Sequence, residues 1–317
     1  MAEHWIIALR VFFKHLSNII IISILSIFVL WYYFGRMSVE SGIDAYKRGD
    51  YQDAFKQFKY TAEKGDLIAQ VNLAMMYNKG QGVPENAKEA VKWYFVAANK
   101  GDAVSQYNLA QKYYVGRGVV KDYEKAFKWY KKAADQEDPN AQNSIGQMYH
   151  VGNGVPQDET EAYKWYKLAV DQGNASAFFN LGLLHASGRG VKKDASEAVK
   201  LFLKSAIQGI AEAQYNLGAM YAKGEGVKKD VAEAFKWYLK AADQGNSAAK
   251  HNLGVMYSDG NGVKKDLVKA YVLMNPAAQE ADESAKKNQI EVMIDMTSDQ
   301  YKAAMKIITS NTNSQKK

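Results

Sequence analysis

The chain has 317 residues, of which 47% are hydrophobic and 24% charged, and these proportions exclude a polytopic membrane protein and an intrinsically disordered chain. The absence of cysteine excludes a disulfide framework, a thiolate metal site and a cysteine nucleophile. The formal net charge is +7, but only five of the 41 basic residues are arginines, whose forked guanidinium is the usual reader of nucleic acid, so we expect no nucleic-acid partner.

The first predicted element is a membrane span at residues 16–34, which follows a short basic tail at residues 1–15. The 19 residues of the span carry no charge, and as a helix they extend about 28 Å, the thickness of one hydrocarbon core. Trp31 lies near one end, where aromatic rings prefer the headgroup level. No small-residue cleavage site follows, so we expect an uncleaved signal anchor. The alternative, a buried core helix, would need an apolar partner.

The charges that flank the span do not decide its orientation, because Arg10 and Lys14 precede it while Arg36, Lys47 and Arg48 follow it. Large domains translocate regardless of charge, which leaves the short basic tail as the part that stays inside. We therefore expect a single-pass membrane protein with a cytoplasmic N-terminus and a periplasmic or otherwise extracytoplasmic repeat domain.

From residue 65 to residue 280 the sequence repeats every 36 residues, in six units. Each unit contains Gly-x-Gly-Val between two segments whose apolar residues recur at helical spacing, so we predict a helix, a glycine turn and a second helix. The first glycine is placed to end the first helix in a left-handed conformation. These glycines are Gly80, Gly116, Gly152, Gly188, Gly224 and Gly260.

Aspartate or asparagine stands at almost every predicted helix start, where its side chain can cap the free backbone N–H groups. The caps of the first helices are Asp66, Asp102, Asp138, Asn174 and Asn246, and those of the second helices are Asn86, Asp122, Asp158, Asp194, Asp230 and Asp266. Ile210 takes this place in one unit, and we expect a frayed helix start there.

The pattern A-x(3)-LG-x-x-Y-x-x-G-x-GV-x-x-D-x(3)-A-x-x-WY-x-x-AA strongly resembles the Sel-1-like repeat family, a variant of the tetratricopeptide repeat with a longer turn. The resemblance covers about residues 41–280 and implies an all-α fold, a right-handed α-solenoid of helix-turn-helix repeats. It is specific for fold and not for function. Residues 35–64 resemble a linker and a shorter tetratricopeptide-like unit, in which the Gly-x-Gly insertion is missing.

Beyond the repeats, residues 281–309 are expected to form a helical cap, since a terminal solenoid unit needs a polar outer face. Thr297 or Ser298 would cap its final helix, and Pro276 is expected to kink or end the helix before it. Residues 310–317 are polar and are expected to be disordered. Similar tails occur on exported bacterial members of the family, which implies a location in a bacterial cell envelope.

Residues that recur at the same position of every unit are expected to pack in the same way in each unit. Candidate binding residues are therefore the first-helix positions that vary between units. They mix aromatic, aliphatic and amide groups, which suits a peptide or helix laid in a concave groove. The candidates are Val71, Met75, Tyr107, Gln111, Asn143, Gln147, Phe179, Leu183, Tyr215 and His251, with Asn108, Asn180 and Asn216 from an asparagine ladder. In tetratricopeptide proteins such an asparagine can hold a ligand's carboxylate; alternatively, it bonds backbone between stacked helices.

We expect no catalytic residue, no cofactor and no metal site. His150 and His251 lie on first helices almost three units apart, too far for one zinc site. Some Sel-1-like proteins have been labelled β-lactamases, and Ser284 with Lys287 matches S-x-x-K, but K-T-G is absent.

The sequence therefore predicts a membrane-anchored scaffold or adaptor that binds a protein or peptide partner in a bacterial envelope. One alternative is a cell-wall glycan binder that stacks sugars on Tyr107, Phe179 and Tyr215. The other is a hydrolase of the β-lactamase type.

Overall fold

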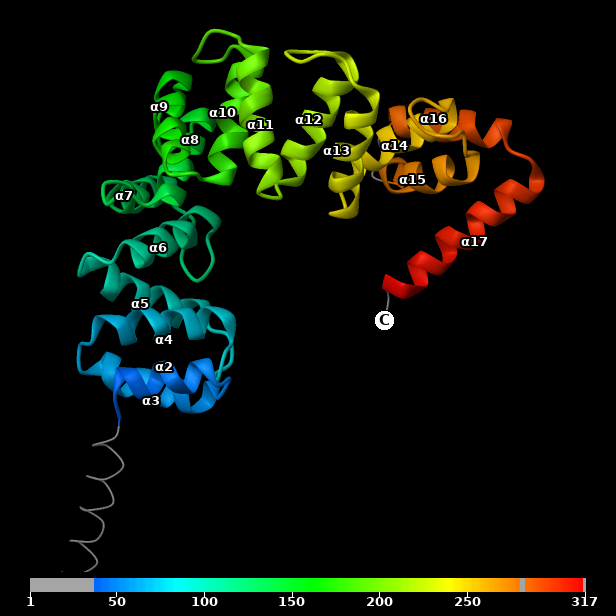
Figure 1. Cartoon of the computed structure of the whole chain (residues 1–317). Coiled ribbons are helices and arrows are strands. Elements are labelled where there is room, and N and C mark those ends of the chain that lie inside the picture. The colour runs from blue at the N-terminus through cyan, green and yellow to red at the C-terminus, as the bar shows by residue number, and fades with distance from the viewer. Residues whose placement is uncertain (1–36, 280–282, 316–317) are drawn as a thin grey trace, which may run out of the picture. The chain divides into compact units, whose positions relative to one another are not determined.

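The computed structural model describes residues 37–279 and 283–315, and within these ranges the chain forms sixteen α-helices and no strand (Figure 1). The predicted basic tail and the predicted span at residues 16–34 lie outside the described residues. Of the helices in the described ranges, none combines the length and the apolar composition that a membrane crossing requires. The helices group into two compact units, one that ends at Gln136 and one that begins at Glu137.

The first unit consists of three helix pairs in which each helix packs on the next in chain order. The pairs are α2 (Val39–Lys47) with α3 (Tyr51–Glu63), α4 (Leu67–Lys79) with α5 (Ala87–Asn99), and α6 (Ala103–Val115) with α7 (Tyr123–Ala134). The pair α2 and α3 occupies the place of the predicted tetratricopeptide-like unit, and the two pairs after it are Gly-x-Gly repeats.

The second unit continues the repeats with four more pairs and ends in two further helices. The pairs are α8 (Pro139–Val151) with α9 (Glu159–Asp171), α10 (Ala175–Ser187) with α11 (Ala195–Ile207), α12 (Ala211–Lys223) with α13 (Val231–Asp243), and α14 (Ser247–Asp259) with α15 (Leu267–Gln279). The last two helices, α16 (Glu283–Asp295) and α17 (Ser298–Gln315), both pack on α15. Below, the first helix of each Gly-x-Gly pair is called helix A; these are the even-numbered helices α4 to α14. The second is called helix B; these are the odd-numbered helices α5 to α15.

The predicted caps are present at the helix starts. Asp66 Oδ1, for example, accepts the backbone N–H of Ala69 at 2.8 Å, and Asp194 Oδ1 accepts that of Glu197 at 3.0 Å. Ile210 makes no side-chain cap bond, as predicted, but α12 begins at Ala211 in the same register as the other helices. The expected fraying is therefore not seen, because packing against the neighbouring helices holds this first turn.

The Gly-x-Gly turn has a second function that the sequence pattern did not reveal. The first glycine ends helix A in the left-handed conformation, as predicted, for instance Gly188 at φ 75°. The second glycine lies against the start of the preceding helix B: a Cβ on Gly190 would stand 2.3 Å from the carbonyl oxygen of Glu159. The turn is thus a contact between successive repeats, which only glycine fits.

The core lies between helix A and helix B of each pair and continues from each helix B into the next pair. Trp129 and Trp237 are 9% and 8% exposed and pack in this core, while Trp93 and Trp165 in the same register are half-buried. His185 is half-buried, with its ring centroid 5.9 Å from that of Tyr163. Helix A carries a small residue opposite each helix B aromatic ring, and at Gly182 a Cβ would stand 2.8 Å from the ring of Phe202.

The C-terminal segment differs from expectation in three respects. Helix α15 runs through Pro276 to Gln279, so the proline does not end it at once. Thr297 caps α17, with its Oγ1 accepting the N–H of Gln300, but the helix continues to Gln315 instead of becoming disordered from residue 310. The outer surface is also not uniformly polar, since Ile294 is 71% exposed.

Candidate functional site

All thirteen candidate residues lie on helices A. In the first unit Val71 and Met75 stand on α4, and Tyr107, Asn108 and Gln111 stand on α6; Gln111 is exposed and the others are half-buried. In the second unit α8 carries Asn143 and Gln147, α10 carries Phe179, Asn180 and Leu183, α12 carries Tyr215 and Asn216, and α14 carries His251. Of these eight, Gln147 is exposed and the rest are half-buried.

The three candidate aromatic side chains rest on buried helix B rings. The Tyr107 ring centroid lies 5.5 Å from that of Tyr130. The Phe179 ring lies 5.9 Å from that of Phe202, and the Tyr215 ring lies 5.9 Å from that of Tyr238. The Gln111 amide donates to the Tyr107 hydroxyl at 2.9 Å. These rings are therefore held in place before any partner arrives, which lowers the entropy lost on binding.

Burial also controls the protonation of the ring that supports Tyr215. It raises the pKa of Tyr238 to about 12, an effect that the hydrogen bond with Asn252 opposes. Tyr238 is 4% exposed, so its hydroxyl stays neutral at physiological pH and adds no charge to the surface above it.

The asparagine ladder mostly bonds its own helix. The side-chain amide of Asn72 donates to the carbonyl of Ile68, and that of Asn216 donates to Glu212, both at 2.8 Å. Asn108 makes the same bond to Val104. The expected bonds to backbone between stacked helices are thus replaced by bonds one turn back, and this geometry leaves each amide oxygen pointing away from the bonded carbonyl.

Two contacts link candidates to other elements of the second unit. Asn180 on α10 donates to the Asn143 side-chain oxygen on α8 at 2.9 Å, which joins two neighbouring repeats. Asn288 on α16 lies 3.2 Å from His251 Nε2. The helix A row of this unit therefore ends against α16.

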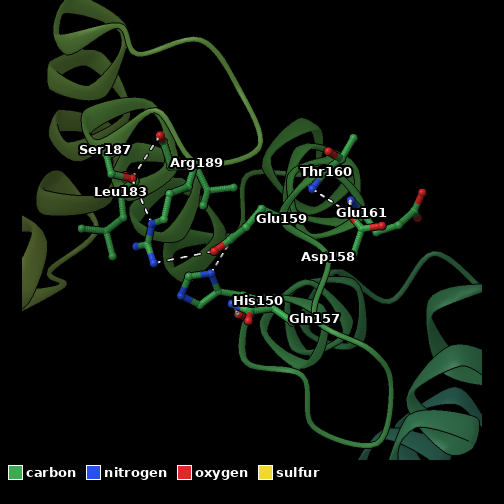
Figure 2. Close-up of polar contacts among 10 residues, drawn as sticks. His150, Gln157, Asp158, Glu159, Thr160, Glu161, Leu183, Ser187 and Arg189 are labelled. Atoms are coloured by element: carbon green, nitrogen blue, oxygen red, sulfur yellow. Dashed lines mark hydrogen bonds and ion pairs between the residues drawn. The ribbon is translucent and has the colours of Figure 1, made fainter.

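A charged cluster lies at the C-terminal end of α10 (Figure 2). His150 Nδ1 lies 2.7 Å from Glu159 Oε2, and Arg189 reaches the other carboxylate oxygen at 3.6 Å. The same arginine donates to Ser187 Oγ, which in turn donates to the carbonyl of Leu183 at 2.7 Å. Because the cluster joins α8, α9 and the loop after α10, it stabilises the C-terminal turn of α10 that follows Leu183.

Within residues 37–279 and 283–315, no three histidine, aspartate or glutamate side chains gather where a metal ion could bind. Ser258, at the end of α14, donates to the carbonyl of Val255 at 3.0 Å and to the adjacent Asp259 carboxylate. These bonds are local to the helix end.

Sequence reasoning missed a buried lysine. Lys112 on α6 stands where the other helices A carry methionine or leucine, and it is 8% exposed. Its ammonium donates to the Asn78 side chain, and burial lowers its pKa. The break in the apolar pattern of that register was the available signal.

Sequence reasoning also missed a relay in which an exposed glutamine that follows one helix B bonds a buried glutamine of a helix A. Gln106 donates to the carbonyl of Ala98 at 3.1 Å, and Gln136 donates to the Gln106 side-chain oxygen at 2.8 Å. Gln244 donates to Gln214 in the same way at 2.8 Å. The relay satisfies the last carbonyls of helix B, so it binds repeats together and is not a ligand site.

The sequence matches the Sel1 repeat family model over six consecutive segments, residues 67–102, 103–138, 139–174, 175–210, 211–246 and 247–282. The chain belongs to the Sel1 repeat family. Together with the helix pairs described above, this confirms the predicted α-solenoid of 36-residue repeats.

Two solved structures are similar to this Sel1 repeat chain. A Sel1 repeat protein from Oxalobacter formigenes is 39% identical, with a TM-score of 0.71 over 77% of this chain and 100% of its own. The uropathogenic Escherichia coli protein c5321, described as a protective antigen with an SLR fold, is 29% identical, with a TM-score of 0.59 over 86% and 67% of the two chains. Comparison with functionally curated proteins finds no match.

Proposed function

We propose that this Sel1 repeat chain is a non-catalytic, membrane-anchored scaffold whose helix A surface binds a peptide or helix of a protein partner. The observation that carries the proposal is the contrast within each repeat. Core leucines, capping residues and turn glycines recur every 36 residues, while the half-exposed helix A residues change from repeat to repeat. A constant framework with a variable face is the arrangement of a recognition surface.

The chemistry of the helix A surface favours a peptide. In the second unit Phe179 and Tyr215 offer rings fixed by the core, and Asn143 and Gln147 offer amide groups. In the first unit Tyr107 offers such a ring and Gln111 an amide. Aromatic anchors surrounded by amides bind apolar side chains and extended or helical backbone together. The half-exposed aromatic rings also suit a sugar, so a cell-wall glycan is the second candidate ligand.

Photo-crosslinking tests the binding surface. A benzophenone side chain at Gln147, whose own side chain is exposed on α8, should capture one defined partner in the native envelope. The same group at Lys192, exposed in the loop after α10, is the matched control and should not capture it. Phe179→Ala combined with the Gln147 probe should reduce capture at least tenfold. Capture of muropeptides without protein, or equal capture by the probes at Gln147 and Lys192, would contradict the proposal that this surface binds a peptide.

The membrane part of the proposal rests on the sequence of residues 16–34 and the basic tail before it. A cytoplasmic N-terminus and an extracytoplasmic repeat domain follow from the short tail. Alkaline phosphatase fused after Lys317 should be active, and a reporter that needs the cytoplasm should be inactive at the same position. The reverse pattern would place the repeats in the cytoplasm.

A further inference from the structure

Residue 273 stands in a helix B position that holds tryptophan in four of the six repeats. The tryptophans are Trp93, Trp129, Trp165 and Trp237. Trp237 belongs to a buried cluster with Ala206 and Leu217, and Leu203 packs against that cluster. The indole therefore fills a space between its own helix B, the preceding helix B and the helix A between them.

Leucine replaces the tryptophan in two repeats, and in the first of these the lost volume is recovered. Phe178 on α10 stands where the equivalent repeats carry glutamine, for example Gln214. Phe178 and Leu201 share one buried cluster and are 6% and 4% exposed. A larger residue on helix A thus compensates for the smaller one on helix B.

The second replacement, Leu273 on α15, is not compensated. Lys250 stands at the position of Phe178, and Leu239 stands at the position of Phe95, whose ring meets the Trp129 ring edge-on at a centroid distance of 6.1 Å. A pocket of about 400 Å³ opens there between α13, α14, α15 and α17. Its apolar walls are Leu239, Ala242, Leu253, Val272, Leu273 and Ile307.

This pocket, called below the Leu273 pocket, has the place of an indole in the repeat. Ala242 and Leu253 are the register equivalents of Ala206 and Leu217, which lie in one cluster with Trp237 a repeat earlier. Leu239 is 44% exposed and Ile307 of α17 is 41% exposed, so the apolar walls are open to solvent.

The charges at the mouth of the Leu273 pocket are unequal. Lys250 and Lys269 line it opposite a single acidic residue, Asp243. Lys269 Nζ lies 4.0 Å from Asp266, and its side chain is 61% exposed. In the part of the chain that the structure describes, Lys250 has no acidic partner. The mouth therefore favours an anionic group beside an apolar one.

We propose that the Leu273 pocket binds an aromatic side chain of a partner protein that carries a carboxylate next to it. The ring takes the position that tryptophan holds in other repeats, and the carboxylate pairs with Lys250. An aromatic anchor in a small apolar pocket is the usual form of a binding hot spot. The site involves none of the thirteen helix A candidates, so its test does not depend on whether the helix A surface binds a peptide.

N-acetyl-L-tryptophan is a suitable probe, because it joins an indole to a carboxylate, whereas N-acetyl-L-tryptophanamide lacks the charge and N-acetyl-L-leucine lacks the ring. Each is titrated into the full chain while methyl NMR follows Leu239, Leu253, Leu273 and Ile307. We expect the acid to shift these methyl signals and to bind at least threefold more tightly than the amide. N-acetyl-L-leucine should bind at least tenfold more weakly than the acid.

Three variants separate the proposal from non-specific binding. Leu273→Trp fills the pocket and should weaken probe binding at least tenfold, while Leu201→Trp, the same change where Phe178 already fills the space, should leave it unchanged. Lys250→Gln introduces the residue that equivalent repeats carry and should make the acid and the amide bind equally. This variant remains informative if Leu273→Trp does not fold.

Four results would overturn the assignment: no methyl shift at the pocket, equal affinity for the leucine derivative, undiminished binding by Leu273→Trp, or an acid preference that persists in Lys250→Gln. Methyl shifts that appear with rising protein concentration alone would instead assign the pocket to a second copy of the chain.

Discussion

Alanine in place of Gly190 and alanine in place of Gly182 are expected to have very different effects, although both glycines belong to the same repeat. Gly190 has φ 66°, and an alanine in the left-handed region costs about 1–2 kcal/mol. Its Cβ would also stand 2.3 Å from a backbone oxygen of Glu159, which cannot rotate away. Separating the two repeats to relieve such an overlap costs about 1–3 kcal/mol, so we expect a total loss of about 2–5 kcal/mol.

Gly182 lies inside α10, where alanine improves helix stability by about 0.5–1 kcal/mol. Its Cβ would approach two ring carbons of Phe202 to 2.8 Å, and a shift of that ring costs about 1–2 kcal/mol. Ala74 and Ala110 occupy the same register in the first unit and are fully buried there, so the fold accommodates the methyl group. The net effect of Gly182→Ala should therefore be a loss of only about 0–1.5 kcal/mol.

Native-state hydrogen exchange is the appropriate assay, because a repeat array need not unfold in one step. Gly190→Ala should lower the protection of α9 and α10 most, since each repeat contacts only its neighbours. Gly182→Ala should leave protection nearly unchanged. An equal loss in both variants, or a loss spread evenly over residues 37–279, would refute the reasoning.

Three further predictions follow from single residues. Glu137 has φ 64° where the other repeats carry glycine. Glu137→Gly should therefore raise the free energy of unfolding of the second unit by about 1 kcal/mol. The thermal midpoint should rise, and a lower midpoint would contradict the prediction. Burial raises the pKa of Tyr94 and Tyr238 from 10 to about 12, so the unfolded chain releases these protons first and the free energy of unfolding falls between pH 10 and about 12. Tyr94→Phe should remove about 2–3 kcal/mol of that loss in urea unfolding at pH 12, and an unchanged pH dependence would exclude this tyrosine as its cause. Trp237→Ala should lower the free energy of unfolding by about 3–5 kcal/mol. Tyr215→Ala, which loses only a half-buried ring in tilted contact with Tyr238, should lower it by about 1–2 kcal/mol. Equal losses in chemical denaturation would make Tyr215 a core residue.

Helix boundaries could be predicted because their signals are local. The Asp66 side chain caps a backbone N–H only three residues away, and Gly188 ends α10 through its own φ angle. Such contacts involve neighbouring residues, so the residue type at one position is enough to indicate them. Ile210 shows the limit of this rule, since α12 starts at Ala211 without a side-chain cap.

The exposure of the candidate site could not be predicted in the same way. The sequence predicts that Tyr107 and Tyr215 line a groove, and in the structure both are half-buried against helix B rings. The variable register identified the helix and the face, but the burial depends on the size of a residue 23 positions later in the chain. Periodicity indicates which way a side chain points and contains no information on how deeply its neighbours cover it.

The sequence by itself determined the repeat length, the helix pairs and their caps, because each depends on contacts within one repeat. Only the tertiary structure decided which irregular residues matter. Leu201 and Leu273 both stand where the other four repeats carry tryptophan. Phe178 fills the space beside Leu201, whereas Lys250 leaves a pocket beside Leu273. The physical reason is that packing depends on the volume shared by residues on three helices, which no single position in the chain specifies.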